Sequence, residues 1–373
     1  MSLLTIAMWL GMASAHPSYF VYVGTYTGAD SKGIYAYRFD PGSGSLDSIG
    51  LAGEVVNPSF LTIHPNHKYL YAVSELGNDG KTHGLVTAFS IDAKTGGLTK
   101  LNTVSTIGGG ACHLVVDQTG KSLLVANYGT GSVAAFPVHE DGSLGESTAL
   151  MQHEGSSANP RRQRGPHAHG VYLSADNRFV FVPDLGLDKV MVYRLDAAHA
   201  TLKANDPPFA QVEPGSGPRH FAFQPGGKHA YLINEMGSRV TAFDYDAARG
   251  ALKEIQTIST LPKDFSGTDN SAEIEVDAKG RYLYASNRGH DSIAIFAIAK
   301  NGTLTPVDYV STQGKIPRNF KIDPTGGYLL AANQNTNNIV LFRVDRKSGG
   351  LTATGKSVEV HAPVCIQFLP AGS

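Results

Sequence analysis

The chain has 373 residues, of which 42% are hydrophobic and 17% are charged, and its formal net charge is −1. Nucleic-acid-binding proteins concentrate basic residues on one face, so this balanced charge argues against a nucleic-acid partner. The 42 glycines indicate many turns, and the apolar content is sufficient for an extended core.

The first segment, residues 1–15, is apolar and ends in Ala13-Ser14-Ala15, which has the small-x-small form of a signal-peptide cleavage site. It lacks the positively charged start typical of secretory signals, and it is too short to span a bilayer. We expect a signal peptide over 1–15, a mature chain that begins near His16, and a periplasmic or secreted protein. Without a genuine leader, the expected location is cytoplasmic.

One strand-like pattern then recurs seven times: a β-branched residue, an aromatic residue three positions later, and an apolar residue two positions after that. The aromatic residues are Tyr37, Phe89, Phe136, Tyr193, Phe243, Phe296 and Phe342, which are 46 to 57 residues apart. A repeat of this length with one such signal per period is typical of a β-propeller.

The rest of each repeat supports this interpretation. Six of the seven aromatic strands are followed by a Gly-x-Leu or Gly-Gly-Leu turn, as at Gly44–Leu46, and only the fourth has Ala200 in place of the glycine. Before each of the last six aromatic strands lies another strand-turn-strand pattern, such as Leu61–Val73. Short strands separated by turn residues predict four-stranded antiparallel blades.

The first repeat has only one strand, Phe20–Gly24, before its aromatic strand, so its innermost strand is missing. Residues Ala362–Pro370 match that strand in the other repeats. Because an open ring would leave sheet edges unprotected, we predict an all-β, seven-bladed propeller closed by this C-terminal strand joining the N-terminal blade. Residues 16–373 then form one domain with no membrane span, and we expect a monomer.

Candidate site residues lie where the start of each innermost strand meets the end of the next strand, because antiparallel neighbours exchange start for end. Most strand positions are apolar, whereas these positions hold polar residues that differ between repeats: His113, His169, Arg219, His220, Glu235 and Arg288. A neighbouring position holds similar small polar residues in every repeat, among them Asn333, and is interpreted as a turn requirement.

Four segments carry a resemblance to a known family: 159–169, 217–220, 234–235 and 286–292. Together they resemble the seven-bladed lactonase family over nearly the whole chain after the leader. That family contains the propeller type of 6-phosphogluconolactonase and the fungal carboxy-cis,cis-muconate cyclase.

The resemblance implies lactone chemistry at the channel mouth. It implies a catalytic set of His169, Arg219, Glu235 and Arg288, with His167 as an alternate histidine. Many relatives have a histidine after the Glu-Ile step of the sixth repeat, where this chain has Glu275, so the resemblance assigns no role to that position.

The same residues suit hydrolysis on physical grounds. A lactone hydrolase needs a base that activates water, a stabiliser for the oxyanion, and a cationic clamp if the substrate is anionic. Glu235 or His169 can act as the base, and Arg219 and Arg288 suit the oxyanion and the anionic group. No Gly-x-Ser-x-Gly nucleophile motif precedes a strand-to-helix turn, which favours attack by water.

Further residues are predicted to bind substrate: His167, Arg161, Arg162, His113 and His220. The arginine-rich stretch 161–164 either catches phosphate or is a solvated loop. We predict no cofactor and no metal, although His113, His169, His220 and Glu273 would form a plausible ligand set if the blades brought them together. Cys112 and Cys365 start strands of blades that are not neighbours, so we expect two packed thiols.

Three functions stay open from the sequence. The first is hydrolysis of a sugar lactone of the 6-phosphogluconolactone type to the aldonic acid. Phosphorylated sugars are chiefly cytoplasmic, so an exported protein favours an unphosphorylated or carboxylated lactone. The second is a cycloisomerase for a carboxy-muconate-type lactone. The third is a non-catalytic binding propeller.

Overall fold

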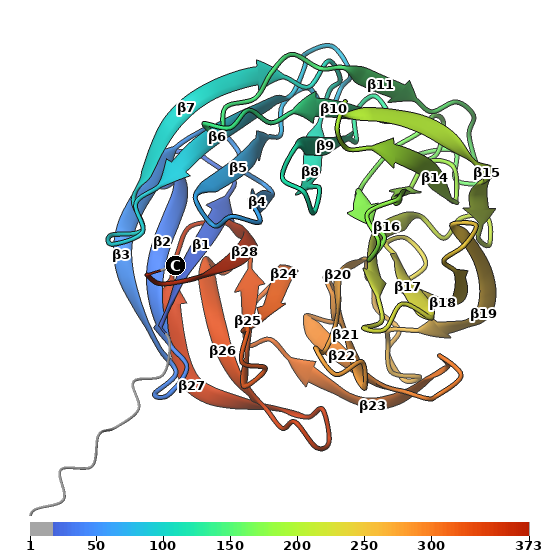
Figure 1. Ribbon diagram of the computed structural model, residues 1–373. Coiled ribbons are helices and arrows are strands. Elements are labelled where there is room, and N and C mark those ends of the chain that lie inside the picture. The colour runs from blue at the N-terminus through green and yellow to red at the C-terminus, as the bar shows by residue number, and fades with distance from the viewer. Residues whose placement is uncertain (1–17, 373) are drawn as a thin grey trace, which may run out of the picture.

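The computed structural model describes residues 18–372, and in this range the chain forms seven four-stranded antiparallel sheets arranged in a ring (Figure 1). The predicted all-β, seven-bladed propeller is therefore confirmed. Within the same range, no helix has the length and apolar character needed to cross a membrane. The predicted leader over residues 1–15 lies outside the described residues.

Each blade runs from an inner strand at the central channel to an outer strand at the rim (Figure 1). The first blade consists of β28 (Pro363–Pro370), β1 (Tyr19–Thr25), β2 (Gly33–Asp40) and β3 (Ser45–Glu54). The second consists of β4 (Leu61–Ile63), β5 (Tyr69–Ser74), β6 (Leu85–Ile91) and β7 (Leu98–Ser105). The third consists of β8 (Ala111–Val116), β9 (Ser122–Asn127), β10 (Ser132–Pro137) and β11 (Ala149–Gln152).

The fourth blade consists of β12 (Tyr172–Leu173), β13 (Phe179–Asp184), β14 (Lys189–Asp196) and β15 (Thr201–Gln211). The fifth consists of β16 (Pro218–Phe223), β17 (His229–Asn234), β18 (Arg239–Asp246) and β19 (Ala251–Ser259). The sixth consists of β20 (Ser271–Val276), β21 (Tyr282–Asn287), β22 (Ser292–Ile298) and β23 (Leu304–Ser311). The seventh consists of β24 (Pro317–Ile322), β25 (Tyr328–Asn333), β26 (Asn338–Val344) and β27 (Leu351–Glu359).

The ring is closed by the C-terminal strand, as predicted. β28 is the innermost strand of the first blade and pairs antiparallel with β1, with Tyr22 opposite Gln367 and Val23 opposite Ile366. One further backbone hydrogen bond, from Ala371 N to Ser18 O at 2.9 Å, continues this pairing. The first blade therefore joins segments from both ends of the described chain.

The turn glycines predicted from the sequence also join neighbouring blades. Gly142 has φ 82°, and a Cβ there would lie 2.3 Å from the ring of Tyr69 in the preceding blade. Its carbonyl accepts a 3.0 Å hydrogen bond from the Tyr71 hydroxyl. The same contact recurs in the pairs Tyr22–Gly96, Tyr231–Gly302 and Tyr284–Gly349. Ala200, which replaces this glycine in the fourth repeat, still adopts φ 50°.

The core lies between the blades. Every residue of the second strands β9, β13, β17 and β25 is buried, whereas outer strands such as β27 are largely exposed.

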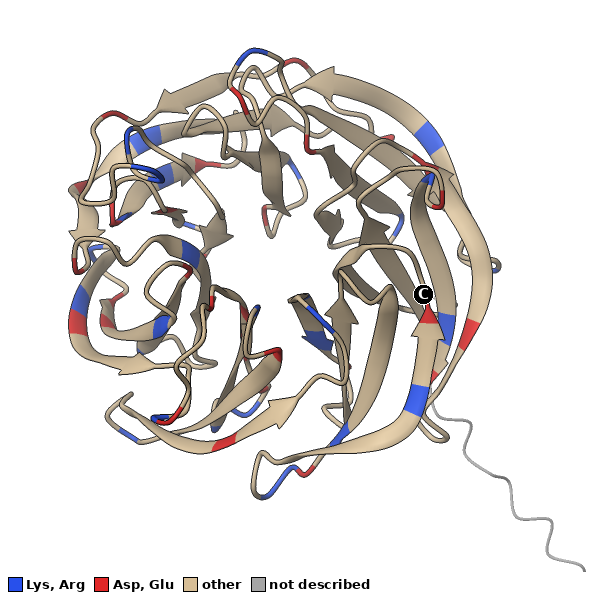
Figure 2. Ribbon diagram, turned by 180° about the vertical axis from the view of Figure 1, so that it is seen from behind, with Lys and Arg blue, Asp and Glu red and all other residues tan. Residues whose placement is uncertain are grey.

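Cys112 and Cys365 are buried and unpaired, as expected. Figure 2 shows basic and acidic residues interspersed around the ring. The side chains of the second strands are buried in the packing between blades. The polar groups for a site must therefore come from the loops and strand ends at the two mouths.

The asparagines at the ends of the second strands brace the neighbouring loops. Asn127, Asn287 and Asn333 are fully buried. Their Nδ2 atoms donate to the carbonyl oxygens of threonines that follow the outer strands, at 3.2, 2.7 and 3.1 Å. These contacts support the structural interpretation of this position.

Candidate active site

One mouth of the channel holds a polar cavity of about 280 Å³. It is lined by Tyr26, Glu75, Asn78, Cys112, Tyr128, Arg162, His169, Glu235, Arg288 and Arg318. Most of these residues lie at the start of an innermost strand or at the end of the next strand. These are the strand ends at which the sequence predicts the candidate site residues to lie.

Glu235 is the centre of the cluster. Its Oε2 atom lies 3.1 Å from Arg219 Nε and 2.9 Å from Arg288 Nη2, and its Oε1 atom lies 2.8 Å from Arg162 Nη2. His169 Nε2 lies 3.7 Å from Oε2. Three of the four predicted catalytic residues thus surround the fourth, and Arg162 joins them.

The charge state of Glu235 follows from these contacts. Burial alone would raise the pKa of its carboxyl group, because burial disfavours the charged form. The guanidinium groups of Arg288, Arg219 and Arg162 outweigh burial and hold the pKa of Glu235 well below its usual range. At neutral pH Glu235 is a firmly ionised carboxylate, and it is a weak base.

Unlike the ionised Glu235, His169 is held in its neutral form. Burial, with the positive charges of Arg219 and other neighbours, lowers the pKa of His169 well below its usual value, so the imidazole is neutral at pH 7. The residue is 5% exposed and lines the cavity.

Next to His169, a Cβ on Gly170 would lie 3.0 Å from Arg219 O. Glycine therefore allows the backbone beside His169 to approach the inner strand of the fifth blade.

Arg219 lies behind Glu235 and does not line the cavity. It is 2% exposed, and its Nη1 atom donates to Ala272 O at 2.8 Å and lies 3.3 Å from His220 Nε2. His220 Nδ1 in turn lies 3.0 Å from Glu273 Oε1. Since a guanidinium only donates, Nε2 of His220 accepts and its Nδ1–H donates to Glu273. This chain fixes the tautomer of His220 and the orientation of Arg219.

His113 and His220 form a layer below the cavity. The His113 ring lies 4.0 Å from the ring of Phe60, 4.7 Å from that of Tyr172 and 5.2 Å from that of His220, measured between centroids. The predicted substrate-binding residues His113 and His220 therefore contribute to an aromatic floor and do not line the cavity.

The arginine-rich stretch has one residue at the cavity. The buried side chain of Gln163 anchors the stretch by donating from Nε2 to Leu185 O and to Asp188 Oδ2, both at 2.8 Å. This anchor brings Arg162 to Glu235 and to the Tyr128 hydroxyl, at 3.1 Å from the latter. Arg161 is exposed and lies outside the cavity lining.

His167 supports the cavity from behind. Its Nδ1 atom lies 2.9 Å from Tyr128 O, and its ring stacks on the Tyr128 ring at 4.5 Å. Its backbone N–H donates to Asp184 Oδ1 at 2.8 Å. His167 therefore holds Tyr128 in place, whereas the neighbouring His169 reaches the cavity.

Arg318 also lines the cavity, although it is not among the residues predicted for the site. It occupies the same position of its repeat as His169 and Arg219, so the alignment already contained the signal. Its guanidinium lies over the Tyr26 ring at 5.4 Å, and Tyr26 donates its hydroxyl to Glu75 Oε2 at 2.9 Å. Within residues 18–372, Arg318 has no carboxylate ion pair, so its terminal donors are open.

The mouth carries a positive charge excess. The cavity lining contains three arginines, Arg162, Arg288 and Arg318, and two carboxylates, Glu75 and Glu235, which leaves a formal excess of one positive charge. Among residues 18–372, no group of three or more histidine, cysteine or acidic side chains is placed to hold a metal ion. The arrangement can therefore bind an anionic or polar molecule through guanidinium groups beside a neutral imidazole.

Residues 20–368 match the model of the family described as "Lactonase, 7-bladed beta-propeller". The chain belongs to this family, which confirms the resemblance noted in the sequence. It is 40% identical over 352 residues to 6-phosphogluconolactonase from Bacillus subtilis, covering 94% of this chain and 98% of the relative.

Solved structures agree with this assignment. A putative 6-phosphogluconolactonase from Bacteroides fragilis has a TM-score of 0.89 and 38% identity, covering 96% of this chain and 99% of that one. The periplasmic gluconolactonase of Pseudomonas aeruginosa has a TM-score of 0.89 and 37% identity, covering 95% and 99%.

Proposed function

We propose that the protein hydrolyses a sugar lactone to the corresponding aldonic acid by activated water. The observation that carries this proposal is the mouth itself, where arginines and a neutral imidazole surround the ionised carboxylate of Glu235. Relatives named 6-phosphogluconolactonase or gluconolactonase support the same reaction class. 6-Phosphogluconolactone is the reference substrate.

In this proposal His169 is the general base. Its imidazole is neutral at pH 7 and can accept a proton from water, whereas Glu235 is held as a carboxylate by three arginines. A water that loses its proton to His169 attacks the lactone carbonyl, and the imidazolium formed lies near the negative charge of Glu235, 3.7 Å away. Glu235 therefore stabilises the protonated base. The tetrahedral intermediate then collapses with cleavage of the ring C–O bond, and the imidazolium returns its proton to the leaving alkoxide oxygen, which gives the hydroxy acid and neutral His169.

Arg288 supplies the charge for the oxyanion. It lines the cavity, and its Nε and Nη2 atoms donate to Asn270 O, Ser271 O and Glu235. Its Nη1 atom has no protein acceptor within the described residues, so one donor is open toward a substrate. A fixed guanidinium needs little reorganisation as negative charge develops on the carbonyl oxygen. Arg219 acts through Glu235 and is a positioning residue.

Arg318 and Arg162 are proposed to hold an anionic group on the substrate. Arg162 is partly exposed, with 41% of its side-chain surface accessible, and Arg318 has no carboxylate partner in the described range. Guanidinium groups bind carboxylate and phosphate through paired hydrogen bonds. The positive excess therefore favours a phosphorylated or carboxylated sugar lactone over a neutral one.

We also propose that the protein is exported after cleavage near Ala15. The apolar segment ending in Ala13-Ser14-Ala15 motivates this, and the similar Pseudomonas aeruginosa protein is named as periplasmic. Export would favour a carboxylated lactone. Mass spectrometry of the protein from its native host tests the proposal, and an intact Met1 on cytoplasmic protein would contradict it.

The function is tested by pH-stat assays on a lactone panel, with spontaneous hydrolysis subtracted. The panel contains 6-phosphogluconolactone, a carboxylated sugar lactone and neutral gluconolactone. We expect acid release with a higher kcat/KM for the anionic lactones. Product mass separates the outcomes, since hydrolysis adds water whereas cycloisomerisation preserves mass. No turnover of any lactone would contradict the proposal.

A further inference from the structure

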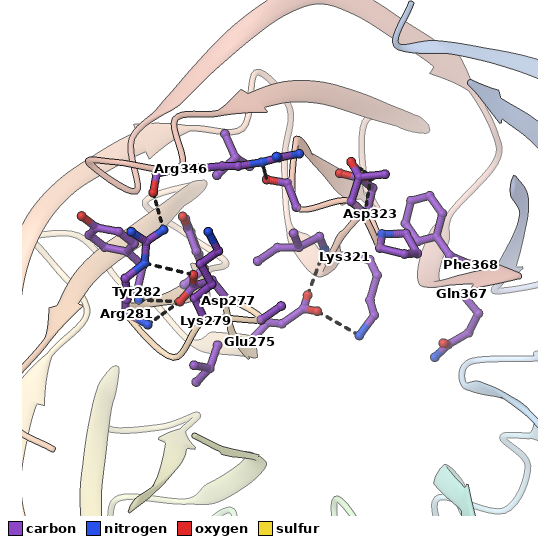
Figure 3. Close-up of a pocket in the computed structure, with 18 residues that line it drawn as sticks. Glu275, Asp277, Lys279, Arg281, Tyr282, Lys321, Asp323, Arg346, Gln367 and Phe368 are labelled. Carbon is purple, nitrogen blue, oxygen red and sulfur yellow. Dashed lines mark hydrogen bonds and ion pairs between the residues drawn. The ribbon is translucent and has the colours of Figure 1, made fainter. Parts of the chain in front are cut away.

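A second cavity, of about 360 Å³, lies between the sixth and seventh blades at the opposite mouth (Figure 3). The inner strands β20 and β24 connect the two mouths. At one end, Ala272 O accepts from Arg219 and Arg318 lines the first cavity, while at the other end Val276 and Ile322 line the second. The second cavity is therefore separated from the candidate active site by the length of a strand.

The walls of this cavity are mainly apolar. The aromatic residues Tyr282, Tyr284 and Phe368 and the aliphatic residues Ile322 and Val344 line it. The Tyr284 hydroxyl donates to Gly349 O at 2.8 Å, so this polar atom is already satisfied by the blade contact. A cavity of this volume, with apolar walls and a few polar groups, is typical of a small-molecule site.

The carboxylates at the cavity are occupied by the protein. Glu275 accepts from Lys321 Nζ at 3.1 Å and from Ile322 N at 3.0 Å. Asp277 accepts from Tyr282 N at 2.8 Å, and Asp323 accepts from Thr325 N at 2.9 Å and from further backbone N–H groups of its turn. These acidic side chains therefore accept hydrogen bonds from backbone N–H groups of the turns and from Lys321. Other hydrogen-bond donors at the cavity have no acidic hydrogen-bond partner.

The basic residues at the cavity keep open donors. The Nε atom of Arg281 is buried without a hydrogen-bond partner, and the nearest carboxylate oxygen, on Asp277, is 3.9 Å away. Arg346 donates from Nε to Gly326 O at 3.1 Å, and its terminal nitrogens have no acceptor in the described chain. Figure 3 shows Lys279, Lys321 and Arg346 around the hollow.

We propose that this cavity is a binding site for a small organic carboxylate with an apolar, planar body. The body would pack against the aromatic and aliphatic walls, and the carboxylate would accept from the terminal nitrogens of Arg346. A charge-assisted hydrogen bond is stronger than one between neutral groups. The proposal does not depend on the lactonase reaction, because none of these residues lies at the candidate active site.

Isothermal titration calorimetry with benzoate tests this site, with benzamide as the neutral analogue of similar shape. We expect saturable benzoate binding in the millimolar range or tighter and much weaker binding of benzamide. Absence of saturable benzoate binding in that range, or equal binding of the two probes, would overturn the proposal.

Variants locate the binding. Arg346→Gln should weaken benzoate binding by about tenfold, the effect of losing one charge-assisted hydrogen bond, while Lys347→Gln, an exposed neighbour outside the cavity, should not. Val344→Trp should abolish binding by filling the cavity, with a cooperative melting transition showing that the variant folds. Arg288→Ala should leave binding intact. Loss of benzoate binding in Arg288→Ala, with retention in Arg346→Gln, would place the anion at the other mouth and refute the proposal.

Discussion

The Nε atom of Arg219 lies 3.1 Å from Oε2 of Glu235, and the two side chains are 2% and 7% exposed. This contact joins the inner strand β16 to the end of the next strand, β17, in the fifth blade. A buried carboxylate needs such partners, since an unpaired buried charge costs several kcal/mol. The pair therefore fixes a negative charge in the wall of the cavity, where it can face His169.

The stability of the protein should depend on this charge in a pH-dependent way. Because the pKa of Glu235 in the folded protein is lowered, its charge stabilises the fold above the unfolded pKa of about 4.3 and loses this effect as the pH falls toward the folded value. Denaturant unfolding of wild type and Glu235→Gln should differ by about 3–5 kcal/mol at pH 7, and the difference should shrink below about pH 4. A difference independent of pH would contradict the assigned charge state.

The pH dependence of catalysis should report His169. Because the pKa of His169 is well below 6.5, its imidazole stays neutral at pH 7 and at pH 6.5. The enzyme should therefore lose activity only at clearly acid pH, where this base becomes protonated. We therefore expect kcat/KM to stay nearly constant from pH 7.5 to about 6.5 and to fall at lower pH. A midpoint at or above 6.5 for the acidic limb would show that His169 is not buried as a neutral base.

The asparagine brace should affect stability and not chemistry. Asn333→Ala removes the donor to Thr312 O, a buried acceptor, and should destabilise the fold by about 1–3 kcal/mol. Turnover should stay within about twofold of wild type. Asn335→Ala, an exposed neighbour on the same loop, is the matched control and should change neither property. A large loss of turnover at unchanged stability would give Asn333 a direct role.

The closing strand should matter for the whole ring. Deleting residues 362–373 removes β28, so β1 loses its inner neighbour and the apolar faces beside it are exposed. Calorimetry should show loss of the cooperative melting transition or aggregation, whereas removal of residues 372–373 alone should not. A soluble chain without β28 that melts at the wild-type midpoint would contradict closure by this strand.

The blades and their closure were predictable because they depend on a local pattern that repeats. The aromatic strand, the turn glycine and the missing first strand are all visible in the order of residues. The mouth was predictable for the same reason, since an aligned repeat brings His169 and Glu235 to the same end of their blades.

Other features depend on contacts between blades and were not predictable. Arg161 and Arg162 are neighbours in the sequence, yet only Arg162 reaches the cavity, because buried Gln163 sets the direction of the loop. The choice between His169 and Glu235 as base depends on their pKa values, which are shifted by arginines on three blades or loops. These arginines come together only in the folded ring. His113 and His220 lie one position further along the repeat than His169 and Arg318, and their side chains lie one layer deeper, in the aromatic floor.

The turnover of His169→Gln and Arg288→Gln on a confirmed lactone substrate tests directly whether hydrolysis takes place at this mouth. We expect a fall in kcat on the order of 10²–10⁴ for loss of the base and 10²–10³ for loss of the oxyanion donor, with unchanged melting cooperativity. Arg178→Gln, an exposed arginine far from the mouth, should retain wild-type turnover. Near-wild-type kcat in both His169→Gln and Arg288→Gln would show that the chemistry lies elsewhere in the propeller.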